Sequence, residues 1–144
     1  MKAAQFSFLL ILLSALTCGC SSPKDIDVDV QAPPVVKSGD EFVITATIDN
    51  HATVAQKLVS LDIGDEYLKG IAIVSMEPNY KDTMHVPIDD TRSFVFDLPV
   101  EPGKQLRILL HAKAIGTGDH NSQIDFCINS NASYLSRTLR TAVE

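Results

Sequence analysis

The chain has no tryptophan, few aromatic residues and only three cysteines among its 144 residues. The Cys…Trp…Cys arrangement of antibody domains is therefore excluded. Cys18 and Cys20 lie close together near the start, whereas Cys127 stands alone. If Cys20 carries lipid after cleavage of the preceding residues, Cys127 has no internal disulfide partner. We then expect Cys127 to be a small buried filler, because a free cysteine behaves as a hydrophobic residue.

The sequence also has no long apolar run. Residues 6–16 form an apolar stretch of 11 residues, whereas a membrane-spanning helix needs about 20. A short apolar stretch that follows Lys2 is typical of a cleaved signal peptide. Gly19 is the small residue that signal peptidase II cleavage requires before a lipid-bearing cysteine, here Cys20. The alternative is an ordinary secretory signal with cysteines nearby.

Residues 16–22 resemble the bacterial lipobox, although Thr17 and Cys18 depart from its usual Leu and Ala or Ser. The resemblance implies a signal peptide over residues 1–19, a lipid on Cys20 and a polar tether over residues 20–24. It also implies a place in the cell envelope, on the extracytoplasmic side of a membrane. Ser21 would direct the protein to the outer membrane in a Gram-negative cell.

Basic clusters are missing as well. The formal net charge is −6, and no run of Lys or Arg interrupts it. A chain of this kind has no electrostatic footprint for nucleic acid. It also lacks the basic patch that binds anionic lipid surfaces. Attachment to the membrane must therefore come from the acyl chains on Cys20.

Downstream of the signal, apolar and polar residues alternate, which is the pattern of strands with one buried face. This alternation is clear in residues 25–30, 42–49, 59–63, 93–98, 106–113 and 124–129, and weaker in residues 71–76 and 134–141. Gly- and Pro-containing turns separate these segments. Apart from a single helical turn at residues 65–68, no helical stripe is expected. The sequence predicts an all-β, disulfide-free, immunoglobulin-like antiparallel β-sandwich of seven to eight strands over residues 25–144.

Two further expectations concern this sandwich. Pro33 and Pro34 end the first strand, which suits an edge strand, and its aspartates would repel edge-to-edge pairing. The residues expected to face inward in the core are Phe42, Ile44, Ile48, Leu61, Phe94, Phe96, Leu106, Ile108, Leu110, Ile124 and Phe126.

The turn and strand signals resemble a known group of domains. Residues 36–50 are similar to the opening of bacterial extracellular Ig-like repeats, of which the CARDB-like (cell-adhesion-related) domains are one example. Residues 100–108 and 114–119 resemble two later turns of these domains. The resemblance implies a surface adhesion or scaffolding role, usually within multidomain proteins.

No catalytic set or cofactor site is recognisable. The four histidines lack ligand spacing, and neither His nor Met follows Cys127 as a blue-copper site requires. The acidic groups at Asp62, Asp65 and Glu66 and at Asp89 and Asp90 match no calcium loop, so they are interpreted as wet turns. No G-x-S-x-G motif is present. We expect no metal, no cofactor and no enzymatic activity.

One segment, residues 76–80, combines an aromatic residue with a methionine in an expected loop, and such residues are enriched in binding cores. Met76 and Tyr80 are therefore a possible binding loop, although packing of Tyr80 over the end of the sandwich is favoured. The sequence predicts a non-enzymatic envelope module that binds a protein partner through loops or an edge strand. A structural accessory subunit of an envelope enzyme or transporter, or a small-ligand binder, are the alternatives.

Overall fold

Alternating apolar and polar residues form strands over most of residues 22–144, which is the part of the chain that the computed structural model describes. The predicted signal peptide and Cys20 lie outside these described residues. In chain order the elements are β1 (Ile26–Gln31), β2 (Val35–Val36), β3 (Glu41–Asn50), β4 (Gln56–Gly64), α1 (Asp65–Leu68), β5 (Ile71–Glu77), β6 (Asp82–Val86), β7 (Thr91–Val100), β8 (Gln105–Ala114), β9 (Gly118–Ser130) and β10 (Ser133–Val143).

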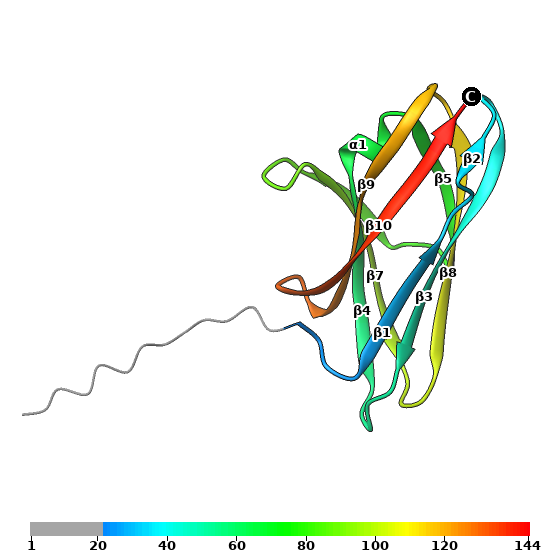
Figure 1. Cartoon of the computed structure of the whole chain (residues 1–144). Helices are drawn as coiled ribbons and strands as arrows, with labels where there is room; N and C mark the ends of the chain where they lie inside the picture. The colour runs from blue at the N-terminus through cyan, green and yellow to red at the C-terminus, as the bar shows by residue number, and fades with distance from the viewer. Residues whose placement is uncertain (1–21) are drawn as a thin grey trace, which may run out of the picture.

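The strands form two sheets that pack face to face (Figure 1). One sheet has the order β1-β3-β8-β5, and the other has the order β2-β10-β9-β4-β7-β6. All neighbouring strands are antiparallel except β2 and β10. The predicted fold class, an immunoglobulin-like antiparallel sandwich without a disulfide in the described part, is therefore confirmed.

The described residues contain ten strands, two more than the upper end of the prediction. Strand β2 is only two residues long and pairs with the end of β10. Strand β6 is mostly exposed and carries charged and polar residues, so it shows no apolar alternation. Both were missed because tertiary pairing, rather than local pattern, makes them strands.

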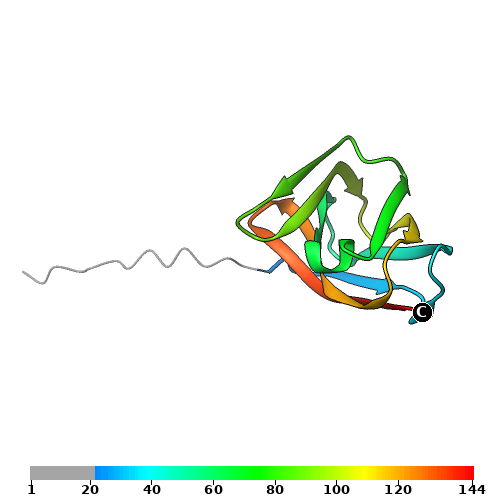
Figure 2. The same cartoon turned by 90° about the horizontal axis from the view of Figure 1, so that it is seen from above.

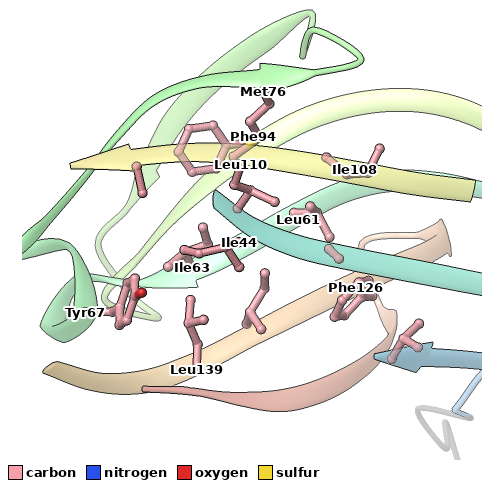
Figure 3. Packing of buried hydrophobic residues seen from close by; sticks show 14 of the residues in the cluster. Ile44, Leu61, Ile63, Tyr67, Met76, Phe94, Ile108, Leu110, Phe126 and Leu139 are labelled. Atoms are coloured by element: carbon pink, nitrogen blue, oxygen red, sulfur yellow. The ribbon is translucent and has the colours of Figure 1, made fainter. Parts of the chain in front are cut away.

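The core lies between the sheets, where Ile44, Ile63 and Leu110 meet (Figure 3). Nine of the eleven predicted core residues are buried. Phe42 and Leu106 are only partly buried, because they lie near the starts of β3 and β8. All of the core residues lie between Ile26 and Val143, so a chain that begins at Ser22 contains the whole described sandwich.

A bulge changes the predicted alternation in β4. The register of β4 shifts between Leu58 and Ser60, against both β7 and β9. Leu58 is consequently buried, while Val59, expected to face inward, is partly exposed. An extra residue in one strand has this effect because side chains alternate with a period of two.

The single helical turn expected at residues 65–68 is confirmed as α1. Its Tyr67 is fully buried beside Leu139 at one end of the core (Figure 3). The Tyr67 hydroxyl is 2.9 Å from Oγ1 of Thr141, which is also buried. Burial raises the pKa of Tyr67 to about 12, and the hydrogen bond with Thr141 opposes that rise. Helix α1 is thereby tied to β10.

The two sides of the sandwich end differently. Strand β1 is an edge strand, as predicted, and its aspartates are exposed. On this side Arg137 of β10 donates from Nε to the carbonyl oxygen of Val28, 2.9 Å away, across the sheets. On the other side, β5 and β6 are the last strands of their sheets. Among residues 22–144, no helix has the length and apolar character needed to cross a membrane.

Candidate functional site

Two turns frame a polar groove on the outer face of the six-stranded sheet. The β6–β7 and β9–β10 turns extend to the same side of the sandwich, as both views show (Figures 1 and 2). The groove has a volume of about 530 Å³. Its lining comes from β4, α1, both turns and the exposed face of β9. We call it the acidic groove; its lining residues are Asp62, Gly64, Asp65, Glu66, Asp89, Asp90, Thr91, Asn121, Ser122, Gln123, Asp125, Cys127, Asn131 and Tyr134.

The lining of the acidic groove includes six carboxylates and neither Lys nor Arg. Asp62 of β4 and Asp125 of β9 are direct cross-strand partners. Like charges in such positions destabilise a sheet. Burial raises the pKa of Asp125; a hydrogen bond from Ser136 opposes this rise, and the nearby charges of Asp62 and Asp89 add to it. Outside the lining, Lys69 pairs with Glu66 and His85 with Asp65, so the carboxylates without a cationic partner among residues 22–144 are Asp62, Asp89, Asp90 and Asp125.

The two carboxylate oxygens of Asp62 also have too few hydrogen-bond donors. Its Oδ2 accepts a weak hydrogen bond from the Cys127 thiol, with 3.5 Å between sulfur and oxygen. Its Oδ1 is buried and has no hydrogen-bond partner among the described residues. A buried acceptor without a partner is rare and costly in folded proteins. A donor from a bound molecule would satisfy it.

The thiol in this groove is not a nucleophile at neutral pH. Cys127 is 2% exposed, which agrees with the expected role as a buried filler. Burial raises its pKa to about 12, and the charges of Asp62 and Asp125 act in the same direction. Because the thiolate is the reactive form, the Cys127 thiol stays protonated and inert.

The sequence pointed to some of these residues without showing that they meet. The acidic groups at residues 62–66 and 89–90 were interpreted as separate wet turns, but the fold brings them into one groove. Asp125 was missed, because its importance depends on the register that places it opposite Asp62. Only strand pairing could have indicated this juxtaposition.

The structure does not support the predicted role of Met76 in a binding loop at residues 76–80. Met76 lies within β5, opposite Leu110, and is fully buried, so the expectation that it lies in a loop is wrong. Tyr80 is partly buried and packs edge-to-face on Phe94, with 5.2 Å between ring centroids. This is the packing role that the sequence favoured for Tyr80.

The histidines lie apart from one another, each with its own partner. The partners are Asp27 for His51 (3.1 Å), Asp65 for His85 (2.6 Å), Glu77 for His111 (2.9 Å) and the Gly116 carbonyl oxygen for His120 (2.7 Å). Within residues 22–144, no three His, Cys, Asp or Glu side chains are grouped so that they could hold a metal ion.

No protein-family model and no curated protein sequence matches this chain. Solved structures nevertheless share its fold at low identity. Escherichia coli alpha-2-macroglobulin in its native conformation is similar over 83% of this chain and 7% of its own, with a TM-score of 0.55 and 18% identity. The form activated by porcine elastase is similar over 83% and 9% of the two chains, with a TM-score of 0.55 and 19% identity.

Another solved structure with a similar fold is a single domain from a different class of protein. The cupredoxin domain of amoB from Nitrosocaldus yellowstonii is similar over 85% of this chain and 89% of its own, with a TM-score of 0.52 and 11% identity. This chain spans less than a tenth of the macroglobulin chains. At such identities the likenesses show a common sandwich fold and nothing finer.

Proposed function

We propose that this protein is a non-enzymatic, lipid-anchored module of the cell envelope that binds a basic segment of a partner protein in the acidic groove. The observation that carries the proposal is the negative charge of the four aspartates in that groove that have no cationic partner among residues 22–144. Above all, the buried Oδ1 of Asp62 accepts no hydrogen bond from these residues. The macroglobulin-type sandwich is consistent with a binding or structural module.

The charge distribution favours a ligand that presents several cationic groups. The six carboxylates come from β4, α1, the β6–β7 turn and β9, so they are spread along the groove rather than supplied by one loop. Lys and Arg side chains are long and carry several N–H donors each. A segment with two or three of them could reach both the floor, at Asp62 and Asp125, and the rim, at Asp89 and Asp90.

The same contacts explain why such a ligand would gain affinity. A cation about 4 Å from a carboxylate near a protein surface interacts by about 4 kcal/mol at an effective dielectric constant of 20. In the groove, a cation would also relieve the repulsion that Asp62 and Asp89 exert on Asp125. Exposed aspartates elsewhere, such as Asp29 on β1, are solvated, so a cation gains less interaction energy from them than from the carboxylates of the groove.

Two sequence features support the location, and the burial of one thiol supports the lack of catalysis. The lipobox-like segment before Cys20 and the likeness to CARDB-like extracellular domains favour an envelope module. The protonated Cys127 thiol argues against nucleophilic chemistry in the groove. The accessory-subunit alternative differs in one respect: it requires a structural contact without a selective groove.

Titration of the domain, residues 22–144, with hexalysine at low salt tests the proposal. The Asp89→Asn/Asp90→Asn variant removes two rim charges, and asparagine tolerates the left-handed backbone of Asp90, whose φ is 49°. We expect its affinity for hexalysine to fall about tenfold, equivalent to about 1.4 kcal/mol.

A matched control makes the same charge change elsewhere. Asp27→Asn/Asp29→Asn removes two exposed aspartates from β1, away from the groove. We expect this control to change the affinity less than twofold. Equal losses in the two variants, or no binding of hexalysine by the unmodified domain, would overturn the groove as the binding surface.

A further inference from the structure

A second groove opens on the side of the sandwich where the two sheets end in β5 and β6. Strands β5 and β6 are the terminal strands of their sheets, and the connection between them crosses this side (Figure 2). The opening has a volume of about 490 Å³, within the range of about 300–1,000 Å³ typical of small-molecule sites. We call it the edge slot.

The walls of the edge slot are largely apolar. Ile71 and Phe94 are buried, and Leu68, Ile73 and Tyr80 are partly buried and pack on the core. These side chains come from α1, β5, the β5–β6 connection and β7. The opposite side of the sandwich has the contact of Arg137 with Val28 across its sheets. Side chains of the core and side chains packed on it therefore line the edge slot on this side of the sandwich.

In the described part of the chain, one cation without a partner lines the slot. Arg92 is opposite Ile63 in the β4–β7 register and lies two residues before the buried Phe94, but its own side chain is exposed. Among residues 22–144, its side chain has no hydrogen bond and no ion pair. An exposed arginine that lines an otherwise largely apolar slot is well placed to receive an anion from a ligand in the slot.

The other charged groups around the slot are already paired. Asp65 accepts a hydrogen bond from Nε2 of His85, 2.6 Å away, and Lys69 forms an ion pair with Glu66. Arg92 is therefore the lining group whose charge is left for a ligand. Its planar guanidinium donates two parallel hydrogen bonds to a carboxylate.

We propose that the edge slot binds a fatty acid, with the aliphatic chain against Ile73, Tyr80 and Phe94 and the carboxylate on Arg92. One unpaired cation matches one negative charge, and the apolar walls match a single hydrocarbon chain. The edge slot shares only Asp65 with the acidic groove, and Arg92 does not line that groove, so we expect the binding of fatty acid not to depend on the proposed protein partner.

Calorimetric titration of residues 22–144 with dodecanoate, below its micelle concentration, tests the proposal. We expect saturable binding of one dodecanoate, and we expect Arg92→Gln to weaken it about tenfold. Arg107→Gln is the matched control, because Arg107 is exposed on β8, away from the slot, and its removal changes the net charge equally. It should leave the affinity unchanged.

Ligand variants separate the chain from the headgroup. Acetate, which has no chain, should not bind measurably, and dodecyltrimethylammonium, which has the opposite charge, should bind at least tenfold more weakly. In nuclear magnetic resonance spectra, the chemical-shift changes caused by dodecanoate should occur at Ile73, Tyr80 and Phe94. Absence of binding, equal affinity for the cationic detergent, equal effects of the two arginine variants, or shifts confined to another face would each overturn the proposal.

Discussion

Alkaline pH should unfold this domain through two buried groups, Tyr67 and Cys127. Both have a pKa near 12 in the folded protein, whereas their ordinary values are 10.0 and 9.0. A pKa that is raised in the folded state contributes stability that is fully present below the unfolded pKa. That stability is lost as the pH rises through the folded pKa. The loss should therefore begin near pH 9 for Cys127 and near pH 10 for Tyr67, and should continue to about pH 12.

The magnitude follows from the linkage relation. Each pKa unit corresponds to about 1.4 kcal/mol. By pH 12, Tyr67 should account for a loss of about 3 kcal/mol and Cys127 for about 4 kcal/mol. Their combined effect, about 7 kcal/mol, is comparable with the whole stability of a typical domain, about 5–15 kcal/mol. We therefore expect cooperative unfolding between pH 10 and pH 12.

Urea unfolding of residues 22–144, followed by circular dichroism from pH 8 to pH 11.5, measures this dependence. Tyr67→Phe loses the hydrogen bond to Thr141, so it should be less stable than the parent by about 1 kcal/mol at pH 8. It should also lose less stability than the parent as the pH rises, so the difference should narrow or reverse. Cys127→Ala should likewise show a weaker pH dependence.

The control for alkaline unfolding is Tyr134→Phe, because Tyr134 is 48% exposed. Its pH dependence should match that of the parent. If Tyr67→Phe and Tyr134→Phe change the pH dependence equally, or if neither buried-group variant changes it, the reasoning from burial is refuted.

Three further predictions follow from single side chains. Phe96→Ala removes a core ring that is 1% exposed, so urea unfolding should show a loss of about 3–5 kcal/mol; a loss below about 1 kcal/mol would contradict its inward register. Because the pKa of Asp125 is raised, its charged form destabilises the fold, and Asp125→Asn should raise the melting temperature at pH 7 more than at pH 3. An equal rise at both pH values would disprove that charge effect. Cys20→Ser in the full chain should move the protein from the membrane to the soluble fraction and abolish palmitate labelling, and continued membrane attachment would contradict lipidation at Cys20.

The sequence predicts the sandwich well because its inward and outward faces differ in polarity along most strands. The aspartates of β1 face outward, and Ile108 and Leu110 of β8 face inward, as alternation indicates. The prediction fails where tertiary pairing overrides the local pattern. Strand β6 depends on β7, and the bulge near Val59 depends on both neighbours of β4.

The acidic groove was beyond sequence reasoning for the same physical reason. Asp62 and Asp125 are far apart in the chain, and only the β4–β9 register places them opposite each other. The Asp89–Asp90 turn joins them because β7 is the next strand in the sheet. Arg92 was likewise not identifiable, since its place in the lining of the edge slot follows from the pairing of β7 with β4 and β6. The sequence indicates that these turns are acidic, but strand pairing decides which of them lie together.

Photo-crosslinking in intact cells tests most directly whether the acidic groove binds a partner in the envelope. A photoreactive phenylalanine analogue at the exposed groove residue Asn121 should give one adduct of discrete mass with a protein. The same analogue at Lys113, exposed on β8 in the other sheet, should give none. The Asn121 adduct should disappear when Asp89→Asn/Asp90→Asn is introduced. No adduct at Asn121, an equal adduct at Lys113, or an adduct that survives the loss of both aspartates would contradict the account.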